Sequence, residues 1–218
     1  MKTDAQIEKD VERELAWDTR TWKLGIDVEV RDGIVDLNGM VRSFADKLAA
    51  QDAALRVTGV LDVVNGVTVQ IDRQITDEEI AHAVRQVLRW NAKVPHEMIK
   101  SSVTYGWVTL TGVVSTLSQS ENAEHLVEQL TGVKGVRNEI VVQLVEQSSD
   151  ELKEVIRKAL ERRADREALR LRINVVDGEI DITGRVHSWQ ERKAVLGSIT
   201  PLAGVRKIND RLRIDPYF

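Results

Sequence analysis

The chain has 218 residues, a formal net charge of −4 and no cysteine; 42% of its residues are hydrophobic and 30% are charged. This composition is that of a globular rather than a disordered protein, and the lack of cysteine excludes disulfides, iron–sulfur clusters and thiol chemistry. The acidic balance argues against a general nucleic-acid binder, because such proteins are usually basic.

The sequence contains no hydrophobic segment of the length that a membrane span or a signal peptide needs. No window reaches about 18 uninterrupted apolar residues, so we expect no transmembrane segment. The first residues, MKTDAQIEKDVER, lack the apolar core of a signal peptide. We therefore expect a cytoplasmic protein whose contact with a membrane would be peripheral.

Glycines recur at a fixed spacing of 73 and then 72 residues. Three sets keep it: Gly33, Gly106 and Gly178; Gly39, Gly112 and Gly184; Gly59, Gly132 and Gly204. A period this long does not suit a solenoid repeat and fits a small complete domain. We predict three tandem domains at residues 3–72, 76–145 and 148–215, called modules 1, 2 and 3 below.

Each module is predicted to begin with a helix. In module 1 the apolar residues Ile7, Val11 and Leu15 are four residues apart, which places them on one helical face. A capping box marks the start of each first helix, since a hydroxyl residue is followed three residues later by Glu or Gln. The pairs are Thr3 with Gln6, Thr76 with Glu79, and Ser148 with Glu151.

Two short strands joined by a hairpin turn follow the helix. The turn signals are Asp32-Gly33, Tyr105-Gly106 and Asp177-Gly178, because glycine tolerates a positive φ. In module 1 the second strand is predicted to bury Val35 and Leu37, and Gly39 falls on the same inward face. Gly112 and Gly184 are equivalent, and we expect a helix backbone to pass too close to these three glycines for any side chain.

A second helix and a third strand complete each module. Capping signals begin the helix at Ser43, Thr116 and Ser188, and the left-handed glycines Gly59, Gly132 and Gly204 are expected to stop it. The unit is α-β-β-α-β, of the α+β class, with two helices on one face of a three-stranded sheet. The other sheet face is left open to solvent, a neighbour or a ligand.

Glycine-containing motifs of the repeat resemble a known family. Module 2 has GWVTLTGVV and then LTGVKGVRNEIVV; module 1 has DGIVDLNGMV and TGVLDVVNGVTV. In module 3, AGVRKINDRL has Asp210 where the others have Asn65 and Asn138. Three copies in register resemble the BON (bacterial OsmY and nodulation) domain, over essentially the whole chain.

The resemblance implies a non-enzymatic binding protein. Members of the family are thought to associate with phospholipid membranes or bacterial envelopes, often under osmotic or other stress, and no catalytic residue or cofactor carries over. Without a signal peptide, the chain looks more like cytoplasmic proteins with three BON domains. The expected partner is an anionic phospholipid surface or another protein, and self-association is also open. The alternative is a protein–protein adaptor that binds no lipid.

Trp107 is the first candidate binding residue. Alternation along the second strand of module 2 points Trp107, Thr109, Thr111 and Val113 away from the core, whereas module 1 has Ile34 at the position of Trp107. These residues could form an apolar platform for a lipid, a ligand or a partner. The interpretation that we favour is that Trp107 packs against a neighbouring module.

Tryptophans also occur at the ends of predicted helices. Trp17 and Trp90 end the first helices of modules 1 and 2, and Trp189 begins the second helix of module 3. Such residues can insert into a membrane interface. We favour the simpler interpretation that they close the open end of a small core.

Charge differs between the modules. Residues 4–72 carry a formal charge of −6, residues 77–145 carry −2 and residues 149–215 carry +3. The candidate basic site lies in module 3: Arg157, Lys158, Arg162, Arg163 and Arg166. These cations could bind anionic lipid headgroups or another acidic partner, including the acidic module 1. We favour a solvated helix face on which neighbouring glutamates neutralise them.

Other chemistries find little support in the sequence. Glu121 and His125 are one helical turn apart but have no evident third ligand, so no metal site is expected. His187 beside Ser188 suggests a hydrolase, yet Ser188 is better explained as a helix cap. The GVKG segment spells the GxxG of RNA-binding KH domains, but it joins a helix to a strand instead of two helices. RNA binding is therefore not expected.

Overall fold

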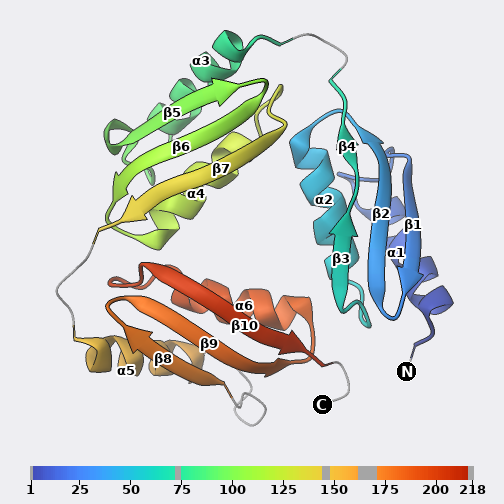
Figure 1. The fold of residues 1–218 in the computed structure, drawn as a ribbon. Coiled ribbons are helices and arrows are strands. Elements are labelled where there is room, and N and C mark those ends of the chain that lie inside the picture. Colours follow the sequence, from blue (N-terminus) through green and yellow to red (C-terminus); the bar gives the residue numbers. More distant parts are fainter. Residues whose placement is uncertain (1, 72–74, 144–147, 162–170, 216–218) are drawn as a thin grey trace. The chain divides into compact units, whose positions relative to one another are not determined.

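The computed structural model of the protein describes residues 2–71, 75–143, 148–161 and 171–215. Within these residues the chain forms three separate sheets, and each sheet carries two helices on one face (Figure 1). The predicted α+β class and the α-β-β-α-β order of each module are confirmed.

Module 1 contains a sheet whose third strand is interrupted. Its elements are α1 (Asp4–Trp17), β1 (Ile26–Arg31), β2 (Ile34–Val41), α2 (Phe44–Leu55), β3 (Asp62–Asn65) and β4 (Thr68–Val69). β2 lies in the centre, antiparallel to β1 and parallel to both β3 and β4. The break at Gly66 and Val67 follows Asn65, whose side-chain oxygen accepts a hydrogen bond from the Val67 N–H at 3.2 Å.

Modules 2 and 3 keep the same order with a continuous third strand. Module 2 has α3 (Asp77–Trp90), a 3-10 turn (His96–Met98), β5 (Ile99–Thr104), β6 (Trp107–Val114), α4 (Leu117–Glu128) and β7 (Gly135–Val142). Module 3 has α5 (Ser149–Glu161), β8 (Arg172–Val176), β9 (Glu179–Val186), α6 (Trp189–Ile199) and β10 (Lys207–Ile214). β6 and β9 are the central strands of these two sheets.

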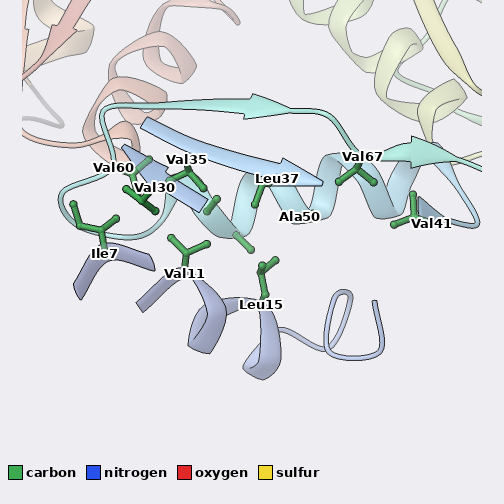
Figure 2. Close-up of a cluster of buried hydrophobic side chains, with 12 residues drawn as sticks. Ile7, Val11, Leu15, Val30, Val35, Leu37, Val41, Ala50, Val60 and Val67 are labelled. Atoms are coloured by element: carbon green, nitrogen blue, oxygen red, sulfur yellow. The ribbon is translucent and has the colours of Figure 1, made fainter. Parts of the chain in front are cut away.

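The core of each module lies between the sheet and its helices. In module 1, Ile7, Val11 and Leu15 point from α1 towards the sheet, where Val35 and Leu37 of β2 are completely buried (Figure 2). The predicted helical face and the predicted inward positions are therefore confirmed. Burial of apolar side chains such as these stabilises the fold by about 1.5–3 kcal/mol each.

The predicted cap residues begin the six α-helices found in the described residues. In each, a side-chain hydroxyl accepts a hydrogen bond from the backbone N–H three residues later: Thr3, Ser43, Thr76, Thr116, Ser148 and Ser188. The reciprocal bond of a full capping box forms at Thr3, Thr76 and Thr116. These bonds satisfy backbone donors that have no partner inside the helix.

The hairpin turns hold two consecutive residues at positive φ. In module 1 these are Asp32 at 52° and Gly33 at 74°, the signature of a type I′ turn. The carboxylate of Asp4 accepts the N–H groups of both residues, at 2.8 and 3.0 Å. The first residue of α1 thus fixes the turn, which the sequence alone did not suggest.

The prediction that a helix crowds Gly39 is wrong. A Cβ at Gly39 would lie 2.5 Å from the carbonyl oxygen of Gly25, which directly precedes the neighbouring strand β1, and the φ of Gly39 is +139°. Gly112 has the same φ and faces the carbonyl oxygen of Met98. The backbone entering the adjacent strand, rather than a helix, therefore requires glycine there. Gly184 shares the positive φ, at 155°.

The glycines that follow the second helices also have positive φ. Gly59, Gly132 and Gly204 have values of 104°, 96° and 86°. α2 already ends at Leu55, α4 at Glu128 and α6 at Ile199, so each glycine ends the turn after the helix rather than the helix itself.

Candidate binding surfaces

The face of each sheet opposite its helices carries the most distinctive side chains, and that of module 1 is acidic. Its charged residues are Asp27, Glu29 and Arg31 on β1, Asp36 on β2 and Asp62 on β3, giving a formal charge of −3. Glu29 lies directly opposite Asp36 in the antiparallel register, and Arg31 forms an ion pair with Glu29 at 2.6 Å. Like charges placed opposite each other destabilise a sheet. The face consequently favours a cationic neighbour.

The open face of module 2 is nearly neutral and holds Trp107. The outward placement predicted for Trp107, Thr109, Thr111 and Val113 is confirmed, because Val108 and Leu110 between them are completely buried. Trp107 is 55% exposed. Its six-membered ring lies over Gly135 of β7, where a Cβ would come within 2.4 Å of the ring. This contact within the module was not foreseen from the sequence.

The open face of module 3 is basic. Five exposed cations share it with Glu179 and Asp181, for a formal charge of +3: Arg172, Arg185, Lys207, Arg211 and Arg213. Thr183 of β9 pairs with Arg172 on one side and Arg211 on the other, so these two cations lie on the outer strands with Thr183 between them. Among the described residues, Arg172, Lys207 and Arg213 have no anionic partner.

The basic stretch predicted in module 3 is only partly described. Arg157 donates two hydrogen bonds to Glu154, at 2.6 and 2.9 Å, and the Lys158 ammonium lies 3.7 Å from the same carboxylate. Glu154 therefore partly neutralises both cations, and their role as a binding site stays a prediction. Arg162, Arg163 and Arg166 lie outside the described residues.

The tryptophans at the ends of α1 and α3 do not close the cores of their modules. Trp17 is 81% exposed and Trp90 is 80% exposed, which contradicts the interpretation favoured above. The buried residues there are Thr21 and Val94, at equivalent positions four residues later. The Thr21 hydroxyl donates a hydrogen bond to the Leu15 carbonyl oxygen at 2.7 Å, so this polar residue is satisfied inside the core.

An ion-pair network lies beside the end of α1. The Arg20 guanidinium donates to Asp18 at 2.8 and 3.2 Å, and the Arg20 backbone N–H donates to the same carboxylate. Arg56 of the α2 C-cap bridges Asp18 and Glu14. These partners, Arg20 foremost, hold the pKa of Asp18 well below its usual range.

All three modules match one protein family over nearly their full length. The profile of the BON domain matches residues 3–71, 76–143 and 148–216. The chain belongs to the BON family. The resemblance seen in the repeated glycine motifs is thereby confirmed.

Two proteins similar to these BON modules share less than a third of the aligned residues. Osmotically-inducible protein Y of Escherichia coli (strain K12) is 29% identical over 121 residues, which are 53% of this chain and 60% of the relative. The match therefore spans less than two thirds of the relative's length. CdsD, a structural protein of the type III secretion system of Chlamydia trachomatis, matches at 16% identity over 95% of this chain and 91% of that one, with a TM-score of 0.28. That score is too low to support an argument about fold or function.

One position of the BON motif connects the third strand with the second helix. It is occupied by Asn65, Asn138 and Asp210. In module 2 the Asn138 amide donates to the carbonyl and hydroxyl oxygens of Ser120 at 3.2 and 2.9 Å. In module 3, where Arg192 replaces Ser120, its Nε donates to the Asp210 carboxylate at 2.6 Å. The departure of module 3 from the motif is thus matched by a compensating change on α6.

In the described parts of the BON modules, no group of three or more His, Asp and Glu side chains could hold a metal ion. In the same residues, no helix combines the length and apolar character that crossing a membrane requires.

Proposed function

We propose that this BON protein is a non-enzymatic binding protein that attaches peripherally to anionic phospholipid at the cell envelope during osmotic or general stress. The observation that carries the proposal is the open, basic sheet face of module 3. The name of the Escherichia coli relative, an osmotically inducible protein, supports the link to osmotic stress. A cytoplasmic location is part of the proposal.

The basic face suits a flat array of phosphate groups. Arg172, Lys207 and Arg213 come from the two outer strands β8 and β10, so the cations spread across the width of the sheet. Each Lys or Arg near an anionic membrane contributes about 1 kcal/mol, and the attraction is screened by salt. Five exposed cations with two carboxylates among them favour weak, reversible binding.

Co-sedimentation with vesicles tests this function. The full chain is mixed with vesicles containing phosphatidylglycerol, or with vesicles of phosphatidylcholine alone, across a salt series. We expect binding only to the anionic vesicles, decreasing steeply as salt rises. Failure to bind anionic vesicles at low salt would overturn the lipid proposal.

Charge-reversal variants locate the site. Lys207→Glu/Arg213→Glu reverses two cations of the basic face and should abolish vesicle binding. The control Arg85→Glu/Arg89→Glu makes the same change of net charge at two exposed residues of α3. Equal loss in both variants would show that net charge, rather than this face, governs binding. The pair Arg162→Glu/Arg163→Glu tests the basic stretch in the same assay.

A protein–protein adaptor is the second candidate, favoured by the open face of module 2. Three exposed apolar side chains lie on this face, namely Trp107, Val113 and Val141. Exposed aromatic residues are enriched at protein interfaces. Crosslinking in cells with a photoreactive residue at Thr109 should trap a protein on this face, and Trp107→Ala should abolish that crosslink. Unchanged crosslinks in the variant would rule out Trp107 as the contact.

A further inference from the structure

Modules 1 and 3 carry opposite charges at equivalent positions of the same sheet face. Asp27 and Arg172 both lie on the first strand of their modules, 145 residues apart, and both point away from the core. Asp62 and Lys207 are separated by the same 145 residues and begin the third strand of each module. Since the fold is the same, it does not explain this reversal.

Strand register shows how these charges are spread. In module 1, Asp62 pairs with Ile34 of the central strand, and Asp27 pairs with Asn38. The charges therefore lie on both outer strands of the sheet. The same holds in module 3, where Lys207 pairs with Glu179 on the central strand. When two such faces meet with their strands aligned, the outer strands of the acidic face lie over the outer strands of the basic face in either direction.

Each face also contains neighbouring like charges, and a face of the opposite charge packed against them would reduce their repulsion. Glu29 lies across from Asp36 in module 1, and Arg185 lies across from Arg213 in module 3. Directly opposed like charges are unfavourable within a sheet. Sheets that pack face to face lie about 10 Å apart, a separation that long Arg and Lys side chains span easily.

We propose that the protein self-associates head to tail, with the acidic sheet face of module 1 in one copy docking on the basic sheet face of module 3 in a second copy. We assign the partner to a second copy because every chain carries one acidic sheet face and one basic sheet face, so each copy can supply the face that the other needs. A heterologous contact of this kind closes into a ring or continues as a chain of molecules. The contact is electrostatic, so it forms at low salt and dissociates as salt rises.

Two variants of the full chain test the contact without any lipid. Asp27→Lys/Asp62→Lys makes both faces basic, and Arg172→Glu/Lys207→Glu makes both faces acidic. Sedimentation velocity at low salt should show concentration-dependent association of the unaltered chain. Each variant alone should associate at least about tenfold more weakly, because matched charges repel. An equimolar mixture of the two variants should associate again, because opposite faces are then supplied by different molecules.

Control variants separate this contact from net charge and from lipid binding. Glu8→Lys/Glu12→Lys on α1 and Arg85→Glu/Arg89→Glu on α3 repeat the charge changes elsewhere and should leave association intact. A chain that stays monomeric at every concentration at low salt would overturn the proposal. So would a mixture of the two face variants that fails to associate. Both proposals use the basic face of module 3, so Asp27→Lys/Asp62→Lys, which alters only module 1, distinguishes them: it should lose self-association and keep vesicle binding.

Discussion

The Nε of Arg192 on α6 donates a hydrogen bond to the carboxylate of Asp210 on β10 at 2.6 Å. Both side chains are largely buried, and the Arg192 guanidinium also lies 4.4 Å from the centre of the Trp189 ring. One helix residue therefore connects the start of α6 with the third strand. Module 2 makes the corresponding link with the neutral pair Ser120 and Asn138.

We expect Asp210→Asn to destabilise module 3 although it restores the residue found in modules 1 and 2. The guanidinium of Arg192 would lose its carboxylate in a partly buried site, which costs about 1.5–3 kcal/mol. The double variant Arg192→Ser/Asp210→Asn recreates the pair of module 2 and should recover much of that loss. Hydrogen exchange of the β9 and β10 amides measures both effects. Additive losses in the double variant would contradict the coupling.

A second prediction concerns the ring of Trp107 above Gly135. A side chain at residue 135 would come within 2.4 Å of the ring, so Gly135→Ala must displace it. We expect a loss of about 1–2 kcal/mol in module 2 and a shifted indole N–H resonance of Trp107. In a Trp107→Ala background the same substitution should be nearly neutral. An unchanged indole resonance in Gly135→Ala would show that the ring does not lie over the glycine.

Acid should weaken module 1 through Asp18. The pKa of this carboxyl is lowered in the folded state by Arg20 and Arg56, so its stabilisation is complete above the unfolded value of about 3.9. That stabilisation, about 1–3 kcal/mol at neutral pH, is lost as the pH falls below 4 towards the folded pKa. Asp18→Asn should remove it at neutral pH. Urea unfolding followed by NMR signals of β2 at pH 7 and pH 3 should show the two proteins converging in acid.

The hydrogen bonds between the first helix and the hairpin turn can be tested by two opposite substitutions, one that removes them and one that introduces them. Asp77 of α3 accepts the N–H groups of Tyr105 and Gly106, both at 2.8 Å, whereas module 3 has Ser149 at this position. Asp77→Ser should destabilise module 2 by about 1–3 kcal/mol, and Ser149→Asp should stabilise module 3 by about 1 kcal/mol. Exchange rates of the turn amides report both directly. Equal rates in Asp77→Ser and the unaltered chain would refute the contact.

Much of the fold could be predicted because its signals are local. The spacing of Ile7, Val11 and Leu15 and the caps at Thr3 and Ser43 depend on residues within two helical turns. The three copies also test one another, since a pattern that recurs at the same spacing is not accidental.

What the sequence did not predict depends on contacts between distant residues. Gly39 is crowded by the backbone at Gly25, and Asp4 fixes a turn 28 residues away. The exposed state of Trp17 follows from Thr21 filling the end of the core instead. Aligning Asp27 with Arg172 in the sequence could have revealed part of the charge reversal between the two sheet faces. Asp62 and Lys207 could be assigned to these faces only from the register of the third strand.

Tyr105 adopts a φ of 53°, in the left-handed region, at the turn position where modules 1 and 3 have aspartate. A residue with a bulky side chain is disfavoured there by about 1–2 kcal/mol, and Asp or Asn is disfavoured less. The ring gains no burial in return, since it is 83% exposed. Module 2 therefore has a less favourable turn than modules 1 and 3 at the end of the face that carries Trp107.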